Sequence, residues 1–116
     1  MSTCNRELYN CPVEATIDLI GGKWKALILF HLFGKTLRFS EIHRLVPKAT
    51  QKMLTQQLRD LENDGLINRK IYQQIPPKVE YSLTSMGESL KPVLDSMCRW
   101  GDNYLNKNIN QKCKPD

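Results

Sequence analysis

Two helical patterns near the middle of the chain are separated by only three residues, and this spacing constrains the fold more than any other feature. Ser40 stands where a helix N-cap is expected, just before a short run with apolar residues at helical spacing. Residues 47–49, Pro-Lys-Ala, cannot continue that helix. Thr50 then offers a second N-cap for a helix over residues 50–64, and Gly65 follows as a C-cap. The sequence therefore predicts a helix, a tight turn and a longer helix.

The pattern after Gly65 changes to that of β-strands. Apolar and aromatic residues at 66–72 and 79–83 flank a loop that contains Pro76 and Pro77, and this arrangement predicts a β-hairpin. A short extended piece is expected at residues 37–39, ahead of the first central helix.

Further helices are predicted at both ends of the chain. Pro12 suits the first position of an amphipathic helix that Gly21-Gly22 ends, and the strongly apolar residues 24–33 predict a helix central to the core. A last helix is expected over about residues 85–106, opened by a capping box of Ser85 and Glu88 and kinked at Pro92.

These elements predict a mainly α fold with a small β-hairpin, in the α+β class. A chain of 116 residues has the length of one domain, and neither a repeat nor a linker divides residues 1–116. The order of elements is that of a winged helix-turn-helix with additional terminal helices. In this interpretation the recognition helix covers about residues 50–64 and the wing about residues 67–83.

Positive charge is concentrated in the same central segment. The chain carries a net charge of +5, and residues 35–78 hold nine basic and four acidic side chains, while both flanking segments are neutral. Basic residues grouped in this way are typical of nucleic-acid binding, and a solvated surface without a partner is the alternative.

The predicted recognition helix has one apolar and one polar side. Leu54, Leu58 and Leu61 recur at helical spacing and are expected in the core, and the acidic residues are confined to the last turns. Gln and Arg can read adenine and guanine edges, whereas Lys suits phosphate. The predicted DNA-binding residues are Lys48, Gln51, Lys52, Thr55, Gln56 and Arg59, together with Arg69 and Lys78 on the hairpin. A protein-interaction module is the alternative use of such a domain.

Three segments of the chain resemble the HxlR family of bacterial winged-helix regulators, which are related to the MarR group. They are CPVEATIDLIGGKW at residues 11–24, QKMLTQQLRDLENDGLI at 51–67 and PPKVEYSLTSMGESL at 76–90. The resemblance implies a homodimeric transcriptional regulator, most often a repressor, whose terminal helices, including residues 85–106, form the dimer. It also implies binding to double-stranded DNA at a pseudo-palindromic operator. Lys78 stands where many relatives have arginine, so a point charge replaces a planar fork there.

The resemblance also assigns a role to a cysteine, because Cys11 matches the position used by thiol-sensing members of the family. A thiol at a helix N-terminus is favoured as the reactive thiolate, which agrees with oxidant or electrophile sensing, while a buried structural thiol is the alternative. Cys113 in the polar tail is a candidate to pair with Cys11 of the other subunit, and Cys4 is equally open. Cys98 is expected to pack in the dimer seam, and the four cysteines are expected to be mostly thiols.

Other classes of protein find little support in the sequence. No apolar stretch is long enough to cross a bilayer and no secretion signal is evident, so a cytoplasmic protein is expected. We expect no catalytic residues, no metal and no cofactor, because neither phosphate-binding loops nor metal-ligand spacings are present. A small-molecule effector remains an alternative to the thiol switch.

Overall fold

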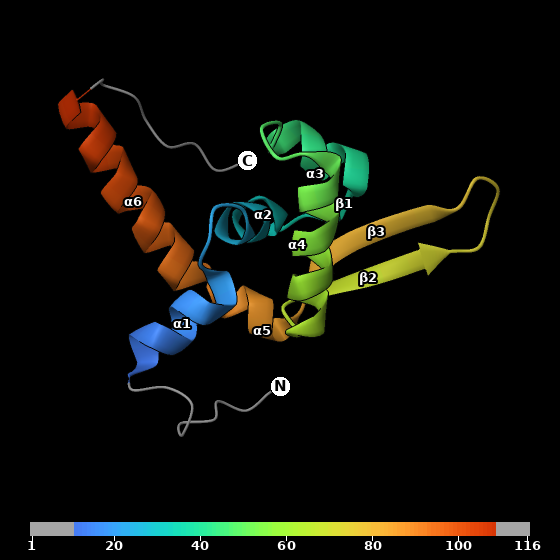
Figure 1. Cartoon of the computed structure of the whole chain (residues 1–116), viewed down its shortest axis with the longest axis horizontal. Coiled ribbons are helices and arrows are strands. Elements are labelled where there is room, and N and C mark those ends of the chain that lie inside the picture. Colours follow the sequence, from blue (N-terminus) through green and yellow to red (C-terminus); the bar gives the residue numbers. More distant parts are fainter. Residues whose placement is uncertain (1–10, 109–116) are drawn as a thin grey trace.

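A computed structural model describes residues 11–108 of the chain, and Figure 1 shows a helical body with a β-hairpin projecting from one side. The elements in chain order are α1 (Pro12–Ile20), α2 (Lys25–Leu32), β1 (Leu37–Arg38), α3 (Phe39–Leu45), α4 (Gln51–Asn63), β2 (Ile67–Tyr72), β3 (Lys78–Leu83), α5 (Ser85–Glu88) and α6 (Lys91–Asn108). The long helix α6 extends away on the side opposite the hairpin. The predicted α+β winged helix-turn-helix fold is confirmed.

The core forms around α2, which lies at the centre of the helical body in Figure 1. Its residues Ile28, Leu29 and Leu32 are buried, as the strongly apolar sequence of this helix predicts. Helices α3, α4 and α6 contribute the further buried residues Ile42, Leu54, Leu58, Leu61 and Leu94. The helix-turn-helix therefore rests on a shared apolar core and is held in a fixed orientation.

The three strands form one antiparallel sheet in the order β1-β3-β2. In the hairpin, Ile67 pairs with Leu83 at the base and Tyr72 pairs with Lys78 toward the tip. The short extended piece expected at residues 37–39 becomes β1, where Leu37 pairs with Tyr81. β1 therefore adds a third strand to the sheet and connects the base of the hairpin to α3.

Side-chain caps define the ends of the helix-turn-helix. The Thr50 hydroxyl accepts a hydrogen bond from the backbone N–H of Met53 at 3.1 Å, which confirms the predicted N-cap of α4. The expected N-cap at Ser40 is wrong, because α3 begins one residue earlier. Glu41 instead accepts a hydrogen bond from the backbone N–H of Arg38 at 2.8 Å, so the third residue of the helix caps the first turn.

The C-terminal segment departs from the expectation of one kinked helix over residues 85–106. The chain forms two helices, α5 and α6, and Pro92 is the second residue of α6. Proline has no backbone N–H to donate to the carbonyl four residues earlier, and its ring clashes with that carbonyl, so the helix ends at Glu88. The N-cap of α5 is Thr84, whose hydroxyl accepts a hydrogen bond from the Gly87 N–H at 3.0 Å; the capping box predicted at Ser85 is wrong.

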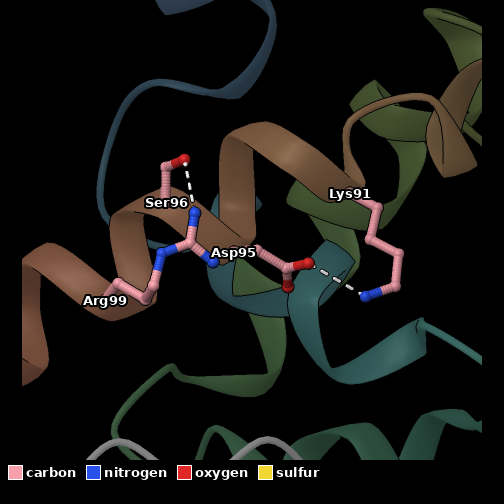
Figure 2. A network of polar contacts seen from close by, with 4 residues as sticks. All are labelled: Lys91, Asp95, Ser96 and Arg99. Carbon is pink, nitrogen blue, oxygen red and sulfur yellow. Dashed lines mark hydrogen bonds and ion pairs between the residues drawn. The ribbon is translucent and has the colours of Figure 1, made fainter.

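Polar side chains stabilise one side of α6, as Figure 2 shows. Lys91 donates to the Asp95 carboxylate at 2.9 Å, one helical turn away. Arg99 donates to the Ser96 hydroxyl at 3.2 Å. Such pairs support an exposed helix by a few tenths of a kcal/mol each, roughly 0.2–0.5 kcal/mol. These polar side chains of α6 therefore find their hydrogen-bond partners within the same helix.

Candidate nucleic-acid interface

The exposed side of α4 carries the predicted contact residues. Leu54, Leu58 and Leu61 point into the core, which confirms the predicted apolar side of this helix. The positions between them turn outward. Gln51, Lys52, Thr55, Gln56 and Arg59 are exposed, as is Lys48 in the turn before the helix. Because the apolar side is fixed in the core, this polar side faces solvent over the N-terminal half of the helix.

The turn that leads into α4 is held from α3. The His43 ring nitrogen Nε2 lies 2.9 Å from the carbonyl oxygen of Ala49, and the ring of Phe39 lies beside that of His43. These two contacts give His43 a structural role. Since Ala49 is buried, this contact anchors the turn between two packed elements while leaving Lys48 exposed.

One of the predicted base-reading side chains is engaged within its own helix. Gln56 donates through Nε2 to the Asp60 carboxylate at 3.0 Å, and Asp60 also lies 4.0 Å from the ammonium of Lys25 on α2. The amide of Gln56 is therefore pre-oriented along the helix, with its carbonyl oxygen still available as an acceptor. The spacing of four residues between a glutamine and an aspartate is the sequence signal for this contact.

A polar recess lies between α4 and the root of the hairpin. It measures about 180 Å³ and is lined by Thr55, Leu58, Arg59, Glu62, Arg69 and Tyr81. Arg69 donates to the Glu62 carboxylate at 3.3 Å across this recess. Burial raises the pKa of the Tyr81 phenol above its usual value, and Arg69 opposes the shift. The structure thus brings Thr55, Arg59 and Arg69 together, and it pairs Arg69 with an acid of α4.

Lys78 lies elsewhere, on the opposite face of the hairpin. Its ammonium is 3.3 Å from the Glu80 carboxylate and 4.9 Å from the centre of the Tyr72 ring. Lys70 is the same distance, 4.9 Å, from that ring. A hydrogen bond from Tyr72 and the charge of Lys78 together hold the pKa of Glu80 below its ordinary value. Tyr72 and Glu80 are absent from the predicted set, although the two-residue repeat of both strands aligns them with Lys70 and Lys78.

The cysteines occupy different surroundings. Cys11 is the N-cap of α1, and within the described residues it is the free cysteine and is exposed. Cys98 on α6 is disulfide-bonded and is therefore an exception among cysteines that were expected to be mostly thiols. Cys98 lines a recess between α2 and α6, and its packing in a dimer seam stays a prediction. Cys113 and Cys4 lie outside the described residues.

An apolar stripe runs along the outer side of the terminal helices. On α6 the exposed residues Val93, Met97, Trp100 and Tyr104 recur at helical spacing, and Val13 and Ile17 are exposed on α1. Trp100 and Tyr104 stack with ring centres 5.6 Å apart. The stripe borders a recess of about 190 Å³ between α2 and α6, lined by Ala26, Leu27, Phe30, Leu94, Met97 and Cys98. Exposed apolar side chains that recur along one side of a helix are typical of a protein interface.

The described residues contain neither a membrane-spanning helix nor a metal site. None of the helices within residues 11–108 combines the length and the apolar character that spanning a membrane requires. Over the same residues, no grouping of histidine, cysteine, aspartate and glutamate has the geometry to hold a metal ion.

Comparison with known proteins decides the family. A family model for HxlR-like helix-turn-helix proteins matches residues 19–109. The chain belongs to this HxlR family. It is accordingly a transcriptional regulator with a helix-turn-helix domain and not an enzyme, as the resemblance seen in the sequence implied.

Relatives within the HxlR family include proteins of known structure. The chain is 57% identical over 102 residues to the HTH-type transcriptional regulator YtcD of Bacillus subtilis, covering 88% of this chain and 81% of YtcD. It is similar to the redox regulator HypR in its oxidized form, with 52% identity, a TM-score of 0.77 and coverage of 80% of this chain and 96% of HypR. The reduced form of the transcriptional regulator YodB from B. subtilis is 34% identical, with a TM-score of 0.71 and coverage of 86% of this chain and 99% of YodB.

Proposed function

We propose that this HxlR-family protein is a homodimeric repressor that binds a specific operator and releases it when Cys11 is oxidised or alkylated. The observation that carries the DNA-binding part is the exposed polar side of α4 beside a basic hairpin. In this arrangement α4 enters the major groove and the hairpin of β2 and β3 acts as the wing on the neighbouring backbone.

The residues of this surface divide by chemistry. Gln56 and Arg59 can make paired hydrogen bonds to base edges, and Lys48 and Lys52 can neutralise phosphates. Reading a base requires the Gln56 amide to turn from Asp60 toward the groove, so Asp60 competes with DNA for this side chain. Arg69 donates to Glu62 of α4 and lines the recess beside Arg59. In this position it supports α4 and faces the same groove of the DNA.

The apolar stripe supports the homodimer. The helices that carry it, α1 and α6, lie on the side of the molecule away from the wing (Figure 1), so a second copy seated there leaves both recognition helices exposed. A dimer with two-fold symmetry implies an operator with two related half-sites, about 10 bp apart or a multiple of that spacing.

The exposed thiol of Cys11 supports redox control, as do the two states in which relatives are known. HypR has been described in oxidized and reduced forms, and YodB in reduced and diamide-treated forms. In our proposal the Cys11 thiol and the Cys113 thiol of the other subunit each lose one proton and one electron as an S–S bond forms, and the oxidant accepts both electrons. The new bond links the terminal segments of the two subunits and changes the spacing of their recognition helices.

The DNA-binding part is tested with a duplex that carries the protein's own upstream promoter. Arg59→Ala is expected to weaken binding about tenfold or more and to relax base preference at one position of each half-site, because a bidentate base contact is lost. Lys107→Ala on α6 is the matched control, since it removes one positive charge far from α4. Equal affinity and equal base preference in wild type and Arg59→Ala would remove α4 from the interface.

The redox part is tested on the same duplex before and after diamide treatment. We expect the reduced protein to bind and the treated protein to release the duplex, whereas Cys11→Ser keeps binding after treatment. Cys113→Ser separates an intersubunit disulfide from an adduct on Cys11 alone. If diamide has no effect on wild type, the signal that controls this repressor is a different one, such as a small molecule.

A further inference from the structure

One face of the wing carries four side chains that take no part in the base contacts proposed for α4. The register of the hairpin pairs Lys70 with Glu80 and Tyr72 with Lys78. Residues directly opposite each other in a sheet share a face, and so do residues two apart along a strand. Lys70, Tyr72, Lys78 and Glu80 therefore lie on one face, opposite to the face that carries Arg69.

The Tyr72 ring is the centre of this group. Both lysine ammonium groups, those of Lys70 and Lys78, lie 4.9 Å from its centroid, within the range of a cation–π contact. The Glu80 carboxylate lies 3.3 Å from the Lys78 ammonium, and the nearby Tyr72 hydroxyl lowers the pKa of this carboxylate. The Tyr72 ring thus contacts both ammonium groups, and one of the two is also paired with Glu80.

The resulting face carries net positive charge. On β1, Arg38 is paired with Glu80 in the sheet register, so three cations surround a single carboxylate on this face. Lys70 and Lys78 repel each other, and without an anchor their long side chains spread into solvent. A ring contact leaves the N–H groups of an ammonium free to donate, so both lysines stay competent to bind phosphate oxygens.

Stability alone does not explain the cluster. The Lys78–Glu80 pair is half-buried, and a single ion pair near the surface contributes little to folding. The wing projects away from the helical body in Figure 1. The cluster is therefore better explained by the fixed positions that it gives the ammonium groups of Lys70 and Lys78 than by a gain in folding stability.

We propose that Tyr72 is a positioning residue for DNA binding, which orders Lys70 and Lys78 as a pair that contacts the phosphate backbone next to the site read by α4. This inference rests on the proposed DNA-binding function and deepens it. Tyr72 itself makes no base contact, and Glu80 pairs with Lys78 until phosphate replaces it.

A double-mutant cycle on the promoter duplex tests the role of Tyr72 in binding. Tyr72→Leu keeps every charge, and we expect it to weaken binding about fivefold near 0.15 M salt and to make the dependence on salt less steep. In a protein that already carries Lys70→Met and Lys78→Met, the same change is expected to have almost no further effect. Equal weakening in both backgrounds would show that Tyr72 acts independently of the lysines and would overturn the proposal.

A second measurement, made without DNA, examines the positioning directly. Protons on the ε-carbons of Lys70 and Lys78 lie near an aromatic ring, so we expect their NMR signals upfield of those of Lys107, and we expect Tyr72→Phe to keep this shift and Tyr72→Leu to abolish it. Unshifted signals in wild type would refute the cluster. A wild type that binds no duplex would instead refute the proposed function, and unchanged affinity in Tyr72→Leu would refute only the role assigned to Tyr72.

Discussion

Single side chains set where the recognition helix begins. The Thr50 hydroxyl satisfies the N–H of Met53, one of the donors that lack a partner in the first turn. We expect Thr50→Ala to lower the free energy of unfolding by about 1 kcal/mol, measured by urea denaturation. Thr55→Ala is the control, because Thr55 donates to the Gln51 carbonyl within the same helix and caps nothing. An equal loss in both variants would contradict a capping role.

The Glu80 carboxylate makes stability depend on pH in a defined direction. Its pKa in the folded protein lies below the ordinary value of 4.5, so its contribution is fully present above pH 4.5 and is lost as the pH falls through the folded pKa. We therefore expect Glu80→Gln to be less stable than wild type at pH 7 and the difference to shrink at pH 3. Urea midpoints of both proteins at the two pH values check this, and a constant difference would count against it.

The limits of sequence analysis are also visible at this scale. The helical spacing of Leu54, Leu58 and Leu61 fixes the exposed side of α4, so the exposure of the predicted contact residues on this helix follows from the sequence. Arg69 and Lys78 were grouped as wing residues, but they lie on opposite faces because the hairpin register places Arg69 opposite Tyr81. That register depends on the length and conformation of the loop around Pro76, which residue patterns do not specify.

At the scale of elements, α5 packs closely against the backbone of Leu66, the residue before β2. Gly87 is buried, and a Cβ there would clash with the backbone carbonyl of Leu66. We expect Gly87→Ala to destabilise the protein by about 1–3 kcal/mol because the backbone cannot yield easily. Gly101→Ala in α6 meets open space and is expected to be neutral or slightly stabilising. Thermal unfolding of both variants provides the comparison, and similar melting temperatures would refute the contact.

The elements that sequence patterns predicted best are those with internal periodicity. The central helices and the hairpin follow from apolar spacing and from the turn residues between them. The junction between α5 and α6 did not, since a proline inside a helical pattern can either kink a helix or end it. Here the Thr84 cap and the contact of Gly87 with Leu66 fix α5 as a separate turn of helix.

At the scale of the whole molecule, the apolar stripe predicts assembly. Trp100 is 70% exposed in the single chain, and burying it against a second copy removes a large apolar area from water. We expect Trp100→Glu to shift the protein from the mass of two chains to that of one, measured by light scattering after gel filtration. Asn106→Glu on the opposite side of α6 is the control. A wild type with the mass of one chain would refute the homodimer.

The two tryptophans of the chain occupy contrasting environments, which gives the protein its own optical probe. Trp24 is buried in the core with 7% of its surface exposed, whereas Trp100 stacks on Tyr104 at the surface. Emission from Trp24 therefore reports on the integrity of the core. Emission from Trp100 responds to whatever covers α6. In a Trp24→Phe variant, a blue shift of the remaining signal with rising protein concentration would follow subunit association without any added label.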